Sequence, residues 1–101
     1  MGLDAVEVDL IGRCLRAVAD GPFFEEWEFS TLFGLSRNEV RSVAVRWPRV
    51  DRSDPLVDVA ITNAMVNLAG YPHRRDEDLR AYVPGGRPEI ERVLSIWRSA
   101  G

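Results

Sequence analysis

Apolar residues recur along most of the chain with the three- and four-residue spacing of amphipathic helices. The first such stripe consists of Val6, Leu10, Cys14, Leu15 and Val18. It predicts a helix over residues 4–20, and similar stripes predict helices over residues 25–33, 36–47 and 54–70 and a last helix from Pro88. Because no long segment alternates between apolar and polar residues, the pattern predicts an all-α fold.

The predicted helix ends carry their own signals. Ser36 followed by Glu39 predicts a capping box, in which each side chain accepts a hydrogen bond from the other residue's backbone N–H. Asp54 before Pro55 predicts an N-cap and a proline at the first helical position. Gly34 is placed to end the second helix in the left-handed conformation.

The segment 71–87 breaks this pattern, because it holds several prolines and glycines. It predicts a long loop with one turn of helix near residues 76–82. The whole chain, residues 1–101, is therefore predicted to be a single compact all-helical domain of about five helices. We expect a helix-turn-helix-like pair in its middle, and Trp27, Trp47 and Trp97 meeting in its core.

Composition narrows the class of protein. The chain has 101 residues, of which 46% are apolar, and this suits one globular domain. Cys14 is the only cysteine and His73 the only histidine, so we predict no intramolecular disulfide, no metal site and no cofactor. The start of the chain lacks the pattern of a signal peptide, and its longest uncharged stretch is shorter than the roughly 18 residues that cross a bilayer. We expect a cytoplasmic protein without a membrane partner, from a bacterium whose GC-rich codons explain why all thirteen basic residues are arginine.

Charge is unevenly distributed. Residues 1–36 contain seven acids and two arginines, whereas residues 37–52 contain five arginines and two acids. The front of the chain is therefore acidic and the second quarter basic.

The basic quarter overlaps a possible DNA-reading motif. With Gly34 at the turn, the buried positions of a helix-turn-helix unit fall on apolar residues, namely Phe29, Phe33, Leu35, Val40 and Val43. The segment resembles the helix-turn-helix motif of bacterial DNA-binding proteins. The resemblance implies base or phosphate contacts by Arg37, Asn38 and Arg41. The alternative is a purely structural helix pair, since any two short helices packed around a glycine turn need the same pattern.

A second candidate is an acidic segment rich in aromatic residues. Glu25, Glu26 and Glu28 lie among Phe23, Phe24, Trp27 and Phe29, and this mixture is typical either of an amphipathic helix or of a contact surface for a basic protein. The later loop adds further candidate contact residues, which are Tyr71, His73, Arg74, Asp76, Glu77 and Asp78.

Catalysis finds little support in the sequence. No nucleophile elbow, phosphate loop or triad-like spacing is present, and adjacent glutamates on a helix point about 100° apart, so they cannot flank one bond. An enzyme or ligand-binding protein would need a deep pocket lined by Asn63, Asn67, Tyr71 and His73. We therefore expect a protein that acts by stoichiometric binding, most concretely an immunity or antitoxin protein that neutralises a partner toxin with a basic domain. The alternative is a DNA-binding regulator.

Overall fold

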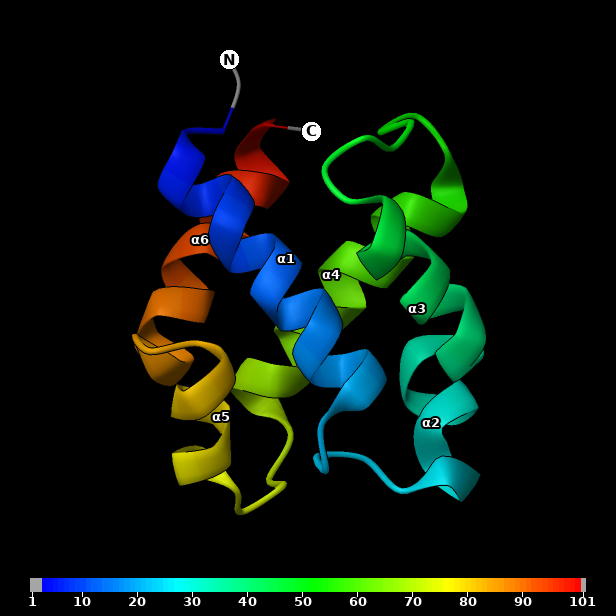
Figure 1. Cartoon of the computed structure of the whole chain (residues 1–101), viewed down its shortest axis with the longest axis vertical. Coiled ribbons are helices and arrows are strands. Elements are labelled where there is room, and N and C mark those ends of the chain that lie inside the picture. The colour runs from blue at the N-terminus through cyan, green and yellow to red at the C-terminus, as the bar shows by residue number, and fades with distance from the viewer. Residues whose placement is uncertain (1–2, 101) are drawn as a thin grey trace.

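The computed structural model is built of helices joined by short connections, and it describes residues 3–100 (Figure 1). In chain order these are α1 (Ala5–Asp20), α2 (Glu26–Phe33), α3 (Arg37–Arg46), α4 (Pro55–Gly70), α5 (Asp76–Tyr82) and α6 (Gly86–Ala100). No strand occurs between residues 3 and 100, which confirms the all-α prediction.

Two long helices form the centre of the molecule. In Figure 1, α1 crosses in front of α4, with α5 and α6 on one side and α2 and α3 on the other. Helix α6 packs mainly on α4, and α3 mainly on α1. The fully buried residues of the two central helices include Ile11, Leu15, Ile61, Met65 and Leu68. The result is one compact globule with a radius of gyration of 12.3 Å.

The helix starts predicted at Ser36 and Asp54 are confirmed. Ser36 Oγ accepts a hydrogen bond from the Glu39 amide at 3.1 Å, and Glu39 Oε1 accepts one from the Ser36 amide at 2.9 Å. Asp54 caps α4 through the Leu56 amide at 2.9 Å, with Pro55 as the first helical residue. Gly34 ends α2 with a φ of 69°, a conformation that a side chain would strain.

The segment 71–87 is more helical than predicted. Residues 76–82 form the whole of α5 rather than a single turn, and α6 begins at Gly86 rather than at Pro88. Helix α5 packs against α1 and buries Leu79 almost completely. One buried leucine is too little to produce a periodic pattern, which explains why this sixth helix was not predicted in full.

The three tryptophans do not meet, contrary to the prediction. Trp97 is buried and donates from Nε1 to Thr62 Oγ1 at 3.0 Å. Trp47 is half-buried against α1, where its Nε1 donates to the Val8 carbonyl at 2.8 Å. Trp27 is 79% exposed. Trp27 lies two positions before Phe29 in the same helix. Residues two positions apart on a helix point in directions about 200° apart, so a helix that buries Phe29 turns Trp27 outward.

Val6 is a second correction. It was predicted on the buried stripe of the first helix, yet it is 64% exposed. It lies in the first turn of α1 and borders a hollow together with Val83, Pro84 and Gly85.

Candidate functional site

The main candidate is a hollow between two connections that are far apart in sequence. One joins α1 to α2 and the other joins α4 to α5. The hollow has a volume of about 420 Å³ and is lined by Pro22, Phe23, Phe24, Glu25, Glu26, Glu28, Tyr71, Pro72, His73 and Arg75. Five of the sequence-predicted contact residues, Glu25, Glu26, Glu28, Tyr71 and His73, are thus brought together. We call this site the acidic hollow.

Aromatic contacts hold the two connections together. Phe23 and Phe24 are buried beneath the hollow. The rings of Phe23 and His73 pack edge to face with 5.1 Å between their centroids. The centroids of the Phe24 and Tyr71 rings are 5.5 Å apart. The sequence did not predict this role for the two phenylalanines, because the residues they contact lie about fifty positions later.

The three glutamates of the hollow differ in their partners. Glu28 accepts a hydrogen bond of 2.7 Å from the Tyr71 hydroxyl. This bond is the main reason that the pKa of Tyr71 is raised, and desolvation is the second reason. Glu26 is exposed and accepts a bond of 2.7 Å from Arg37 Nε. Glu25 is also exposed, at the N-cap of α2, where its side chain makes no capping hydrogen bond. The mouth of the hollow therefore has a negative charge that is only partly compensated.

Trp27 lies between Glu26 and Glu28 in the first turn of α2, on the outer face of the helix, and is not among the residues that line the hollow. The exposed residues around it on the helix are small and polar, Ser30 and Thr31 among them. Because the indole is 79% exposed, most of its apolar surface is available to a partner. The sequence signal for this exposure was its offset from Phe29.

The remaining predicted contact residues lie outside the lining of the hollow. Asp76 pairs with Arg87 Nε at 2.7 Å, and this hydrogen bond lowers the pKa of Asp76. Asp78 pairs with Arg75 at 3.4 Å. Glu77 and Arg74 are exposed, Glu77 in the first turn of α5 and Arg74 just before that helix.

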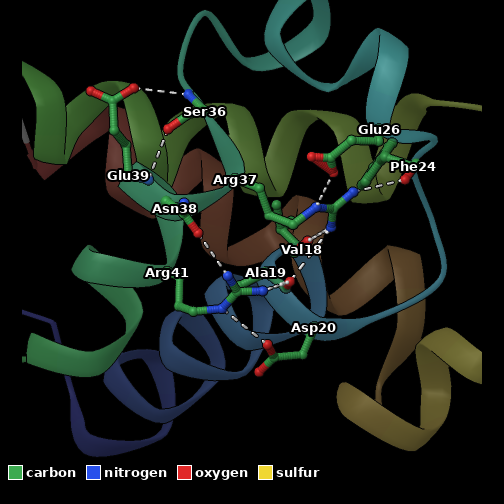
Figure 2. A network of polar contacts seen from close by, with 10 residues as sticks. All are labelled: Val18, Ala19, Asp20, Phe24, Glu26, Ser36, Arg37, Asn38, Glu39 and Arg41. Carbon is green, nitrogen blue, oxygen red and sulfur yellow. Dashed lines mark hydrogen bonds and ion pairs between the residues drawn. The ribbon is translucent and has the colours of Figure 1, made fainter.

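Arg37, the first proposed DNA contact, is engaged inside the protein (Figure 2). Its Nη1 donates to the Val18 carbonyl and its Nη2 to the Phe24 carbonyl, both at 3.0 Å, while Nε donates to Glu26. The guanidinium also lies 4.5 Å from the centre of the Phe29 ring, and only 18% of the side chain is exposed.

The other two proposed DNA contacts join the same network (Figure 2). Arg41 Nη2 donates to the Ala19 carbonyl at 2.8 Å, Nη1 donates to Asn38 Oδ1 at 3.0 Å, and Nε faces Asp20 at 3.4 Å. The two arginines thus cap the C-terminus of α1, whose own last turn holds no basic residue. Most of the Arg37 side chain is thus enclosed, whereas 43% of the Arg41 side chain is exposed and two of its three partners, Asn38 and Asp20, lie at the surface.

The residues considered for a small enzyme are not assembled into one pocket. Asn63 and Asn67 donate to the Phe33 and Leu32 carbonyls at 2.8 and 3.3 Å, and so cap α2 instead of joining Tyr71 and His73. Burial raises the pKa of the Cys14 thiol to about 12, so it is no nucleophile near neutral pH. Residues 3–100 contain no group of three His, Cys, Asp or Glu side chains placed to bind a metal ion.

None of the described helices combines the length and the apolar character that crossing a membrane requires. Comparison of the chain with protein families, with curated proteins and with solved structures finds no match.

Proposed function

We propose that this protein acts by stoichiometric association with another protein, most concretely as an immunity or antitoxin-type protein that neutralises a toxin through a basic surface. The observation that carries the proposal is the exposed Trp27, which lies in α2 between two glutamates that line the acidic hollow, Glu26 and Glu28. In this proposal the indole and the hollow act together as one surface, which we call the acidic–aromatic surface.

Trp27 supplies the energetic centre of the proposed contact. An exposed indole keeps a large apolar area in water, and burying it against a partner is favourable because of the hydrophobic effect. Tryptophan is also among the residues most enriched at the centres of protein interfaces.

The carboxylates supply charge complementarity. Glu25 and Glu26 are exposed, and with Glu28 they place negative charge around the hollow. A partner that presents arginine or lysine side chains would be attracted from a distance and held in one orientation.

Neutralising a toxin requires covering its surface and no chemistry of the neutraliser's own, which suits a single domain of this size. DNA binding through Arg37, Asn38 and Arg41 is the alternative proposal. The geometry supports it less, because a phosphate or base would have to displace the carbonyl oxygens that these arginines now bind.

Affinity capture from cells of the source organism, with one arm treated with nuclease, separates the two proposals. The bait variants are Trp27→Ala and Glu25→Gln, and Thr31→Ala is the matched control on the exposed face of α2. Glu25 is preferred over Glu26 because its replacement leaves the ion pair with Arg37 intact.

The protein proposal predicts one protein retained at equal stoichiometry despite nuclease, lost with Trp27→Ala and kept with Thr31→Ala. That protein should also arrest growth when expressed alone and should cease to do so when this chain is co-expressed. Retention of nucleic acid instead, independent of Trp27, would contradict the proposal and favour the DNA reader.

A further inference from the structure

His73 forms part of the wall of the acidic hollow, and both of its ring nitrogens are engaged. Nδ1 accepts a hydrogen bond from the Arg75 backbone N–H at 3.1 Å, and Nε2 lies 3.1 Å from the Leu68 carbonyl. A backbone N–H can only donate, so Nδ1 must carry a lone pair. The hydrogen bonds therefore assign the neutral tautomer that carries its proton on Nε2 and donates it to Leu68.

This assignment decides the nature of a third contact. Arg87 Nη2 lies 3.2 Å from Nε2, and both atoms carry protons in the assigned tautomer, so they do not form a hydrogen bond. The donors of Arg87 are used elsewhere, on the Ala69 carbonyl at 2.7 Å and the Tyr71 carbonyl at 3.2 Å. A guanidinium thus already lies against the imidazole.

A proton added to His73 would enter at Nδ1 and change two contacts. It would face the Arg75 N–H, which removes that hydrogen bond and sets two donors against each other. The imidazolium would also lie beside the Arg87 guanidinium. The charged groups around the ring are Arg75 on its own connection, Asp76 on α5, Arg87 on α6, and Glu25, Glu26 and Glu28, which line the same hollow. Asp76 is already paired with Arg87, and none of the carboxylates replaces the acceptor that Arg75 would lose.

The connection between α4 and α5 is also under backbone strain. Arg74, between His73 and Arg75, has a φ of 60°, in the left-handed region that residues with a Cβ rarely adopt. The Nδ1 bond spans this residue and so holds it there. Loss of the bond would remove this restraint on Arg74, which lies between His73 and Arg75, and both of these neighbours line the hollow.

We infer that His73 is a pH-sensitive switch of the acidic hollow: the neutral imidazole keeps the wall of the hollow in place, and protonation releases it. As a regulation of partner binding this rests on the proposed function, whereas the structural switch itself does not. Binding of a basic partner to the acidic–aromatic surface should therefore weaken below neutral pH.

The test compares wild type with His73→Asn and His73→Ala by NMR of the full chain at about pH 7.5 and about pH 5.5, the range in which histidine ordinarily titrates. Asparagine is the matched control, because its side-chain oxygen can accept from the backbone N–H two residues later and does not titrate. Imidazole ¹⁵N shifts report the tautomer. The water-exchange rate of the Arg75 amide, corrected for its intrinsic pH dependence, reports the hydrogen bond, with the Leu15 amide as an internal reference.

In wild type we expect the Nε2–H tautomer at the higher pH. Protonation should speed exchange of the Arg75 amide about fivefold to tenfold relative to Leu15, as expected for one lost hydrogen bond. His73→Asn should keep the slow rate at both pH values, and His73→Ala the fast one. An Nδ1–H tautomer, or an Arg75 amide that ignores titration of the imidazole, would overturn the switch whether or not a partner exists. A captured partner that binds wild type equally at both pH values would overturn the regulation and leave the proposed function standing.

Discussion

Arginine is required at position 37 because its side chain donates in three directions at once. The acceptors are two backbone carbonyls and the carboxylate of Glu26. A lysine has a single nitrogen and cannot reach all three from one position. The composition does not predict this role, because nothing in the count of thirteen arginines distinguishes Arg37 from the others until its contacts are known.

Arg37→Lys should therefore destabilise the protein although it conserves charge. We expect a loss of about 1–3 kcal/mol in the free energy of unfolding, because buried carbonyls at the end of α1 lose their donors. Arg49→Lys, at an exposed position, is the control and should change stability by less than about 0.5 kcal/mol. Urea denaturation measures both, and equal stabilities of the two variants would refute the capping role.

Cys14 shows how burial governs reactivity at a single residue. Its thiol is fully buried in the core, which raises its pKa from 9.0 to about 12. Ellman's reagent at about pH 8 should therefore react with the native protein only as fast as the protein unfolds, and at once in denaturant. Prompt reaction of the native protein would show that the α1 core opens readily.

The raised pKa of Cys14 also has a consequence for stability. The folded state holds the thiol proton more tightly than the unfolded chain. The contribution of the protonated thiol to the free energy of unfolding is therefore complete below pH 9.0 and is lost as the pH rises toward about 12. Cys14→Ala should therefore lose less stability than wild type over that alkaline range.

At the scale of helices, three C-termini are capped by side chains from other helices. Arg37 and Arg41 of α3 cap α1, Asn63 and Asn67 of α4 cap α2, and Arg87 of α6 caps α4. The last turns of helices leave carbonyls without partners, and here distant residues satisfy them. Each such contact fixes one helix relative to another.

The pair of Arg87 and Asp76 makes α5 part of this arrangement, and its effect should depend on pH. The pKa of Asp76 is lowered mainly by its hydrogen bond to Arg87, so its contribution to stability is present above its unfolded value of about 3.9 and is lost as the pH falls through the folded value. Asp76→Asn should lower the melting temperature at neutral pH, and the difference from wild type should vanish in strong acid.

Glu77→Gln is the matched control for this pair. It removes one negative charge from the same first turn of α5, so the effect on the helix dipole is shared and only the contact with Arg87 differs. Equal melting temperatures for the two variants at neutral pH would mean that the ion pair does not stabilise the fold.

Local signals predicted the helices well and the contacts between them poorly. The capping box at Ser36 and the Asp54–Pro55 start were readable because all their atoms lie within four residues. Helix α5 was predicted only as one turn because Leu79, its one buried residue, is buried by contact with α1, and the local sequence does not predict that contact. The spacing of Trp27 to Phe29 indicates that Trp27 points outward, whereas its aromatic character predicted a position in the core.

At the scale of the molecule, the sequence indicated the components of the acidic hollow but not their assembly. Glu28 and Tyr71 are 43 positions apart, and no local rule brings them into contact. The packing of α2 on α4 does so, by carrying the start of one helix to the end of the other. The acids of α5 are not among the residues that line the hollow, although they follow His73 closely in sequence.

The most direct measurement is the affinity of the captured partner for wild type, Trp27→Ala and Thr31→Ala, by titration calorimetry at two salt concentrations. The proposed function predicts that Trp27→Ala weakens binding by about thirtyfold or more, as at the centre of an interface, and that Thr31→Ala leaves it unchanged. Added salt should weaken binding to wild type, because exposed charges are screened. Full affinity of Trp27→Ala, with its fold intact, would contradict the claim that the acidic–aromatic surface is the binding site.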